Sequence, residues 1–304
     1  NNAPDYSGFG NDGTVSGATW SATGGYDSKG AYEFDGSDEY ITFDDSSSLE
    51  PASISFGAWI KVQGDGSHSD GVHVLAKGRQ GTTPYYSYSI IYYPTTDLIK
   101  CQVAVSDEWK GVGSTSTFTP PSDWAHVLCT YDGSTIKTYI NGTMENSGSY
   151  SGSITYNMDE DDKLHIGDWN YSSYTRRFQG SIDDVQIYNR SLSADQVYAL
   201  YQNRTNEIVA DETIVGENWT VVAYPNDGYE DGASYVGNDI LIVAQTAGIT
   251  LNDSVIEFGS GYYNETCTTD YAVLNSNTSR SCWINTTAYP TTPDYHSLFN
   301  TGNV

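Results

Sequence analysis

Apolar and polar residues alternate in many short segments over the first two thirds of the chain. In residues 53–62, SISFGAWIKV, the side chains of Ile54, Phe56, Ala58 and Ile60 fall on one face. A period of two residues is typical of a β-strand that is buried on one side. The same pattern predicts further strands, each bounded by Gly, Pro, Asp or Ser, at residues 72–77, 85–93, 99–105, 125–131, 136–140 and 163–167.

Residues 180–203, GSIDDVQIYNRSLSADQVYALYQN, predict a strand, a polar turn and a short helix. Val185 and Ile187 alternate with polar residues, and Ser193 precedes Gln196 by three positions, which is the spacing of a helix capping box. Many short strands with one closing helix indicate an all-β protein built as an antiparallel sandwich of two sheets. The scarcity of helices excludes a parallel α/β architecture.

Two adjacent carboxylates, Asp183 and Asp184, interrupt the last strand of this region. Because side chains alternate between the two faces of a strand, we expect one of the two to face the core side. A charge is tolerated there only if it is paired or bound to a cation.

The closing strand and helix resemble those of laminin-G-like domains, which belong to the concanavalin-A-like jelly rolls. Earlier segments carry the same resemblance in the family's order and spacing: DYSGFGNDGTV at 5–15, AYEFDGSDEYI at 31–41 and WAHVLCTYDGSTIKTYING at 124–142. The resemblance implies that residues 1–203 form an antiparallel two-sheet jelly roll with a short closing helix.

Two more strands, residues 217–224 and 239–245, flank a turn-rich stretch and resemble the last hairpin of immunoglobulin-like modules in archaeal surface proteins. A segment of about 40 residues is too short for a core of its own. We therefore expect residues 204–246 to be a partial immunoglobulin-like module. Its missing strands would come from elsewhere in the same protein or from another chain, because an unpaired strand edge invites strand addition.

The last segment, residues 247–304, predicts a small disulfide-stapled β-module with strands near 254–258, 270–274 and 282–285. The chain starts without Met and without a signal peptide, so we expect a mature or partial piece of a larger exported protein. No run approaches the length of about 18 apolar residues that a membrane span needs, and we expect no direct membrane insertion in these residues.

The chain is strongly acidic, with 13 basic and 39 acidic residues and a net charge of −26. This field repels nucleic acid and anionic membrane surfaces, which excludes them as partners, and it attracts divalent cations. A salt-loving host would also account for such a composition.

The cysteines form two local pairs, Cys101 with Cys129 and Cys267 with Cys282, and neither pair has the spacing of a zinc or redox motif. Two structural disulfides in an extracellular compartment are the preferred interpretation, although four cysteines allow three pairings. N-glycosylation sequons support this compartment, and they begin at Asn141, Asn170, Asn189, Asn203, Asn218, Asn252, Asn264, Asn277 and Asn285.

The family resemblance implies a structural Ca²⁺ where the N-terminal loop meets the closing strand. At the matching positions stand Asp5 and Asp183, and backbone oxygens between Gly8 and Asn11 would complete the shell. Ca²⁺ takes six to eight oxygen ligands, which acidic, Gly-rich loops supply. In the alternative interpretation Asp5 is a turn residue and Asp183 a solvated charge.

Aromatic residues are candidates for ligand binding, because ring faces stack on sugars and Tyr is common in protein interfaces. Tyr86 and Tyr88 lie in the Tyr-rich run PYYSYSIIYY, and Trp109, Trp169 and Tyr171 are expected in loops along one rim. Tyrosines that alternate along a strand are also expected to divide between core and solvent, which is the structural alternative.

Catalytic groups are not expected. Glycosidases on this fold carry two carboxylates on one strand in the pattern E-x-D-x-x-E. The chain has EFDGSD at residues 33–38, one position short, and Gly36 breaks the strand before the third carboxylate. The histidines are scattered without ligand spacing.

These observations favour a non-catalytic, extracellular structural or adhesive surface protein. In one interpretation it is a glycosylated subunit of a cell-surface filament or layer, whose partners are copies of itself, joined by β-strand complementation, or other surface proteins. In the other it is a monomeric, lectin-like adhesion module for a glycan or a protein. A glycoside hydrolase is the third and most distant interpretation.

Overall fold

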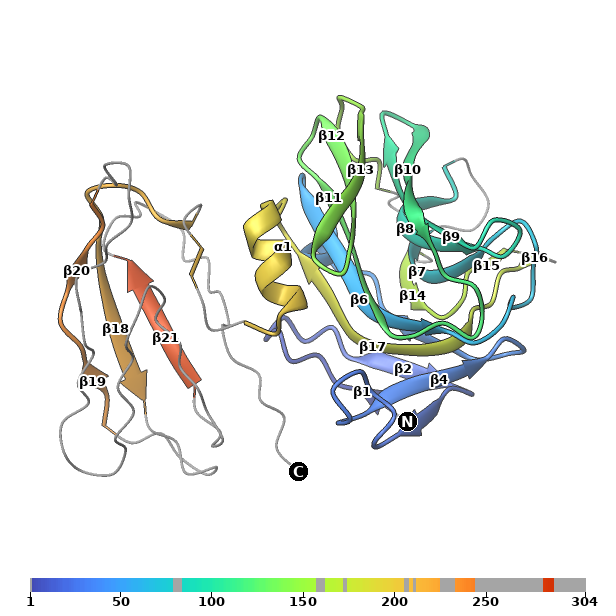
Figure 1. Ribbon diagram of the computed structural model, residues 1–304, viewed down its shortest axis with the longest axis horizontal. Coiled ribbons are helices and arrows are strands. Elements are labelled where there is room, and N and C mark those ends of the chain that lie inside the picture. Colours follow the sequence, from blue (N-terminus) through green and yellow to red (C-terminus); the bar gives the residue numbers. More distant parts are fainter. Residues whose placement is uncertain are drawn as a thin grey trace. The chain divides into compact units, whose positions relative to one another are not determined.

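The computed structural model describes residues 2–78, 84–156, 162–171, 174–204, 208–209, 212–224, 233–243 and 281–286. The chain divides into two compact units, Asn1–Tyr201 and Gln202–Val304. Strands dominate the described part of both units, as Figure 1 shows.

The first unit is a sandwich of two antiparallel sheets, which confirms the predicted fold class. The larger sheet has eight strands, in the spatial order β1 (Asn2–Ala3), β2 (Gly13–Ser16), β5 (Tyr40–Phe43), β14 (Lys163–Ile166), β7 (Val72–Gly78), β8 (Tyr86–Tyr93), β9 (Leu98–Val105) and β10 (Glu108–Thr117). We call it the first sheet.

The second sheet has seven strands, in the order β13 (Thr143–Ser149), β12 (Thr135–Ile140), β11 (Ala125–Tyr131), β6 (Ile54–Val62), β17 (Gln179–Tyr188), β4 (Ala31–Asp35) and β3 (Thr19–Ser21). A short ribbon, β15 (Asn170–Tyr171) with β16 (Tyr174–Thr175), and a 3-10 helix, η1 (Ser47–Leu49), complete the unit together with helix α1 (Ala194–Tyr201).

The core lies between the two sheets, where the inward residues of both meet. Phe56 of β6 and Tyr88 of β8 face each other with ring centroids 5.0 Å apart. Cys101 of β9 and Cys129 of β11 form a disulfide that links the sheets, with both residues fully buried. The structure therefore contains the first of the two predicted disulfides.

Among the strands that were not predicted from the sequence, the two longest, β10 and β13, each lie at a sheet edge. The first is β10 at the end of the first sheet, and the second is β13 at the end of the second sheet. Their sequences, EWKGVGSTST and TMENSGS, lack apolar alternation because few of their residues are buried. Trp109, expected in a loop, is therefore in β10. Side chains join the two edges, since Glu145 Oε2 accepts hydrogen bonds from the backbone N–H groups of Thr115, at 2.6 Å, and Ser116, at 2.8 Å.

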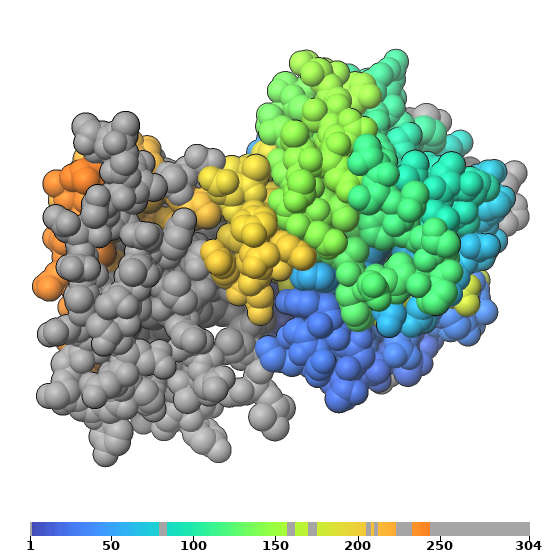
Figure 2. Space-filling view, viewed as in Figure 1, coloured from blue at the N-terminus to red at the C-terminus, as the bar shows by residue number. Residues whose placement is uncertain are grey.

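Helix α1 follows the predicted capping box. The backbone N–H of Ser193 donates to Gln196 Oε1 at 2.9 Å, and the Gln196 N–H donates to Ser193 Oγ at 3.3 Å. Val197 is buried against Leu128 and Tyr139 on the outer face of the second sheet. Figure 2 shows α1 (yellow) on the surface beside the strands coloured green.

The two carboxylates in β17 lie in a β-bulge, because pairing with β6 shifts register between Asp183 and Gln186. Asp184 has a φ of 46°. Asp184 is exposed and Asp183 half-buried, and neither belongs to the core between the sheets. The expectation that one of them faces the core is wrong, because the extra residue turns the strand locally.

The described part of the second unit is one antiparallel sheet. Its strands are β18 (Asn218–Tyr224), β19 (Tyr235–Val236), β20 (Ile240–Leu241) and β21 (Ser281–Thr286). Strand β21, from predicted segment 247–304, pairs with β18, from predicted segment 204–246. One sheet thus includes strands from both predicted modules. An immunoglobulin-like topology stays a prediction. Cys267 lies outside the described residues, and so does the side chain of Cys282. Within the described ranges, no helix is both long and apolar enough to cross a membrane.

Candidate functional site

An aromatic cleft of about 350 Å³ opens on the outer face of the first sheet. Residues of β7, β8 and β10 and of the segments beside them line it: Asp70, His73, Tyr85, Tyr86, Ile91, Tyr93, Trp109, Trp169 and Arg176. We call it the aromatic cleft. Tyr86 and Trp169 are buried and form its floor, whereas Trp109 is 37% exposed. The rings of Tyr86 and Trp109 are stacked with centroids 5.3 Å apart.

A β-bulge places Tyr86 in this cleft. Lys77 of β7 pairs with Tyr88, while the next residue, Gly78, pairs with Tyr86, so that β8 holds an extra residue at this point. Without the bulge, Tyr86 and Tyr88 would share a face, because residues two apart point to the same side. Instead Tyr88 lies in the core and its hydroxyl donates to Leu49 O at 3.1 Å, whereas the Tyr86 hydroxyl donates to Gln102 Oε1.

His73 gives the floor a neutral imidazole of one defined tautomer. Ser89 Oγ donates its single proton to Leu75 O at 2.9 Å, so His73 Nδ1, which lies 2.7 Å from this hydroxyl, must be the donor in their hydrogen bond. Nε2 is then an acceptor. Burial lowers the pKa of His73 well below its ordinary value, and the nearby Arg176 charge lowers it further.

Charged groups stand at the margin of the cleft. Arg176 is half-buried, and its Nη1 donates to Gly71 O at 2.9 Å. Asp70 is exposed, and its backbone N–H donates to His68 Nδ1 at 3.1 Å. A cleft with aromatic walls and a few polar groups has the general composition of a small-molecule site.

The structure therefore separates the predicted ligand-binding residues. Tyr86, Trp109 and Trp169 come together in the aromatic cleft, whereas Tyr88 is a core residue, as the structural alternative proposed. Tyr171 pairs with Tyr174 through the backbone in the β15–β16 ribbon, and its side chain lies outside the described residues. Sequence reasoning missed the polar residues of the cleft, since isolated charges in loops give no periodic signal.

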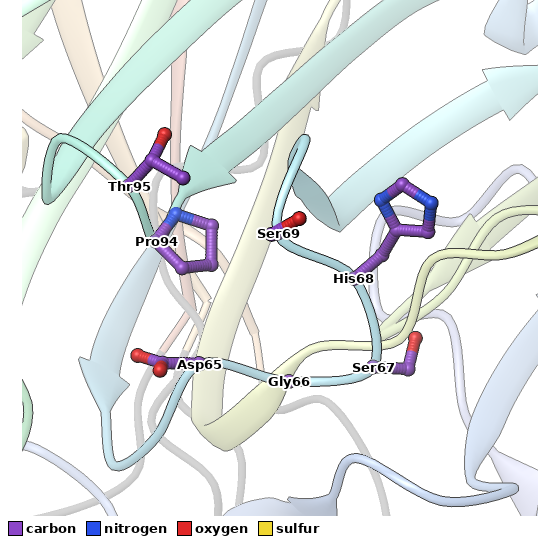
Figure 3. A pocket seen from close by; sticks show the side chains of 7 residues that line it. All are labelled: Asp65, Gly66, Ser67, His68, Ser69, Pro94 and Thr95. Atoms are coloured by element: carbon purple, nitrogen blue, oxygen red, sulfur yellow. The ribbon is translucent and has the colours of Figure 1, made fainter.

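A second, polar hollow of about 380 Å³ lies beside the β8–β9 turn, and Figure 3 shows its residues. It is lined by Asp65, Gly66, Ser67, His68, Ser69, Pro94 and Thr95. We call it the polar hollow. Asp65 extends toward the side of Pro94 and Thr95, whereas the His68 ring points away from them.

The predicted metal residues of the N-terminal loop, Asp5 and Asn11, are engaged in hydrogen bonds. The carboxylate of Asp5 accepts hydrogen bonds from the N–H groups of Ser7 and Asn11, both at 2.8 Å. Asn11 Nδ2 donates to Ser48 Oγ at 3.0 Å. These contacts are what a turn-stabilising aspartate makes, and they lower the pKa of Asp5 despite the opposing effect of burial.

Asp183 contacts a different loop from Asp5. Its Oδ2 accepts a hydrogen bond from the backbone N–H of Tyr26 at 3.2 Å. A Cβ on Gly25 would collide with both Asp183 Oδ2 and the carbonyl oxygen of Gly30. Burial raises the pKa of Asp183 to about 6, and the charges of Asp184 and Asp27 act in the same direction. Asp183 Oδ2 and the Gly30 carbonyl oxygen thus face the same space beside Gly25, and the carboxylates of Asp27 and Asp184 add negative charge nearby.

A third set of acidic residues has carboxylate oxygens as close together as the ligands of a metal ion. Ligand oxygens of Asp45, Glu50 and Asp162 lie within 4.8 Å of one another. The ammonium of Lys77 lies among them, 2.7 Å from Asp45, 3.4 Å from Glu50 and 3.2 Å from Asp162. Lys77 and Asp162 are fully buried. A lysine cation in this position supplies the positive charge that a metal would otherwise bring.

The carboxylates of the EFDGSD segment lie at the end of β4 and in the turn that follows it. Asp35 Oδ1 accepts a hydrogen bond from the Ser37 N–H at 2.7 Å. Hydrogen bonding with Glu39, and to a lesser extent with Ser37, lowers the pKa of Asp35. Glu33 and Asp35 are exposed at either side of the buried Phe34. Asp35 thus stabilises the turn that follows β4.

The described sequon asparagines lie at the surface. Asn141, Asn189, Asn203 and Asn218 are exposed. The remaining sequons, at Asn170, Asn252, Asn264, Asn277 and Asn285, have side chains outside the described residues. Glycosylation of all nine stays a prediction.

A family model described as the concanavalin A-like lectin/glucanases superfamily matches residues 35–198. The chain belongs to this superfamily, and the match covers the part of the jelly roll that holds the aromatic cleft. A comparison with curated proteins gives no match.

Several solved structures share the fold. Domain 4 of AbnA, a GH43 extracellular arabinanase from Geobacillus stearothermophilus, in complex with arabinotriose, is 21% identical with a TM-score of 0.50, over 65% of this chain and 92% of that one. The receptor binding domain of botulinum neurotoxin D is 15% identical with a TM-score of 0.51, over 66% and 50%. The binding domain of Paraclostridial Mosquitocidal Protein 1 is 13% identical with a TM-score of 0.52, over 92% and 72%.

The matched part of this chain thus spans half of the neurotoxin chain. At these identities the likeness shows the fold alone.

Proposed function

We propose that this chain is a non-catalytic, extracellular binding module that recognises a glycan through the aromatic cleft. The observation that carries the proposal is the exposed indole of Trp109 beside the half-buried rings of Tyr85 and Tyr93, on a floor of Tyr86 and Trp169. Flat aromatic faces suit the apolar face of a sugar ring, and nearby polar groups fix its orientation.

Membership of a lectin and glucanase superfamily supports a binding role over a purely structural one. The arabinotriose complex of the AbnA domain supports a carbohydrate, and the neurotoxin receptor-binding domains leave a protein ligand as the alternative. The buried Cys101–Cys129 disulfide supports an oxidising, extracellular compartment.

A structural Ca²⁺ belongs to the same proposal. Asp183 with the Gly30 carbonyl oxygen would hold it, with Asp27 and Asp184 adding negative charge, while Asp5 and Asn11 stabilise the neighbouring loop. Such an ion would fix the loop at Gly25–Gly30 against the closing strand.

A second proposal is that the module is displayed on a cell-surface filament or layer. Its support comes from the second unit, where apolar residues of the short strands are exposed: Tyr235, Val236, Ile240 and Leu241. Among the described residues β19 and β20 each pair with β18 alone, so their outer edges are open to strand addition by a neighbouring copy or another surface protein. Electron microscopy of native material tests this: regular fibres or sheets would support it, and isolated monomers would contradict it.

A glycan array probed with the full chain tests the binding function. The wild type should bind a restricted set of glycans, and Trp109→Ala should weaken that binding by about tenfold or more, about 1.4 kcal/mol. Trp20→Ala is the matched control, because Trp20 is 55% exposed and lies on β3 of the other sheet. Equal binding by Trp109→Ala and wild type would contradict the proposal.

A further inference from the structure

The aromatic cleft and the polar hollow are lined by neighbouring residues of two segments. Asp70 and Tyr93 line the cleft, and their chain neighbours Ser69 and Pro94 line the hollow. The backbone at Gly71 packs on the Tyr93 ring so closely that an added Cβ would lie 3.2 Å from Tyr93 Cε1. The loop that borders the hollow therefore rests directly on the wall of the cleft.

Both sides of the hollow are held in place by hydrogen bonds. On one side, the Ser67 N–H donates to Arg177 O at 3.0 Å, and Ser67 Oγ donates to Thr175 O at 3.0 Å. The Arg177 N–H donates back to Ser67 Oγ at 2.7 Å. On the other side, the Thr96 N–H donates to Tyr93 O at 3.1 Å in the turn. A surface that is ordered before binding loses less conformational entropy when a ligand arrives.

Three polar side chains of the hollow are available to a ligand. Asp65, Ser69 and Thr95 are exposed, and within the described part of the chain their side chains have no hydrogen-bonding partner. A carboxylate accepts hydrogen bonds from hydroxyl groups, and a serine or threonine hydroxyl both donates and accepts. This set matches the hydroxyls of a sugar residue better than it matches an apolar group.

The charges along the two hollows favour an uncharged ligand. Asp65 and Asp70 stand against Arg176, whose Nη1 already donates to the Gly71 carbonyl. The chain as a whole carries a net charge of −26, which repels an acidic glycan. A neutral sugar chain is not repelled by the negative charge of the protein and does not need a free cation in the groove.

We propose that the aromatic cleft and the polar hollow form one groove for an uncharged oligosaccharide, a specificity that rests on the proposed glycan-binding function. One sugar ring lies on the aromatic wall, and the hydroxyls of the next residues bond to Asp65, Ser69 and Thr95. The two hollows, of about 350 and 380 Å³, are each close to the lower limit of small-molecule sites, roughly 300 Å³, so an extended ligand makes use of both.

Isothermal titration of the full chain with neutral oligosaccharides tests the groove. The probes are arabino-, xylo-, cello- and manno-oligosaccharides of increasing length, with galacturonate oligomers as acidic counterparts. For the neutral series that binds, affinity should rise about tenfold from the disaccharide to the tetrasaccharide. The double variant Asp65→Ala/Thr95→Ala should lose this rise and keep its disaccharide affinity within about twofold. Asp123→Ala, which removes another exposed carboxylate, is the control and should match the wild type.

Two results overturn the groove but leave the glycan-binding function standing. One is equal affinity for disaccharide and tetrasaccharide. The other is an undiminished rise in affinity with length in the double variant. In both cases Trp109→Ala would still weaken disaccharide binding. Tighter binding of the acidic oligosaccharides than of the neutral ones would overturn the proposal that the ligand is uncharged. Failure of every neutral and acidic probe to bind the wild type would contradict both the function and the groove.

Discussion

His126 and Asp183 lie opposite the same residue, Trp59, on the two strands that flank β6. The Trp59 ring is stacked on Tyr26, whose N–H donates to Asp183, and it contacts the His126 ring at a centroid distance of 5.4 Å. The side chains of His126 and Asp183 therefore both adjoin one aromatic cluster, Tyr26 with Trp59, on the outer face of the second sheet.

Asp183 is expected to stabilise the fold at low pH. Burial raises its pKa to about 6 from 3.8, so the native state holds a proton that the unfolded state releases between these values. Its contribution is complete below pH 3.8 and is lost as the pH rises through 6. In EDTA, Asp183→Asn should be more stable than the wild type at pH 7 by about 1–2 kcal/mol, with no difference below pH 4. Urea denaturation measures this, and a less stable variant at pH 7 would contradict it.

His126 is expected to have the opposite pH dependence and to stabilise the fold at neutral pH rather than at low pH. It is buried, its Nδ1 has no hydrogen-bonding partner among the residues that the structure describes, and burial lowers its pKa to about 4 from 6.5. The unfolded state therefore binds a proton first as the pH falls, so the contribution is present above pH 6.5 and lost as the pH falls through 4. His126→Phe should retain about 2–3 kcal/mol more than the wild type on going from pH 7 to pH 4. If the free energies of unfolding of the two proteins changed with pH in parallel, the lowered pKa of His126 would be disproved.

Calcium binding at Asp183 makes a separate prediction. A ligand that binds the native state stabilises it, so added Ca²⁺ should raise the melting temperature and EDTA should lower it. Asp183→Asn should abolish the difference, while Asp5→Asn, which weakens the N-terminal turn, should be less stable but still respond to Ca²⁺. Scanning calorimetry in both buffers decides this, and an unchanged wild-type melt would exclude the ion.

The Lys77 cluster predicts a large destabilisation when its cation is removed. Lys77→Met leaves the buried Asp162 without its 3.2 Å ion pair and should cost about 3–5 kcal/mol. The matched control is Lys163→Met, because Lys163 pairs with Asp44, whose side chain is 91% exposed. This substitution should cost less than about 1 kcal/mol of stability. Denaturant titration compares them, and equal losses would show that burial of Lys77 is unimportant.

The disulfide between the sheets predicts a further loss. Cys101 and Cys129 are separated by 28 positions, and the chain-entropy estimate for such a loop is about 3.5 kcal/mol. Cys101→Ala/Cys129→Ala should lower the free energy of unfolding by about 2–5 kcal/mol. Urea denaturation of the oxidised wild type and the double variant measures it, and a loss under about 1 kcal/mol would contradict a stabilising role.

The sandwich could be predicted from the sequence because its central strands alternate strictly, as Ile54, Phe56 and Ile60 show. The capping box of Ser193 and Gln196 likewise fixed the start of α1, since its hydrogen bonds are local. Edge strands such as β10 gave no signal, because few of their residues are buried.

The site could be predicted only in part. The bulge that moves Tyr86 away from Tyr88 depends on pairing with β7 and leaves no trace in the alternation of β8. Asp70 and Arg176 meet at the cleft because loops distant in sequence converge there, which no local pattern reveals. Burial of Lys77 could not be predicted either, since its partners come from two distant segments, Asp45 and Glu50 in one and Asp162 in the other.

A crystal structure of the full chain with a bound neutral tetrasaccharide tests the central claim most directly. The account predicts a sugar ring against Trp109 and Tyr85 in the aromatic cleft, with the chain continuing past Tyr93 toward Asp65 and Thr95 in the polar hollow. A sugar bound on the outer face of the second sheet, or in the second unit, with an empty aromatic cleft would contradict it.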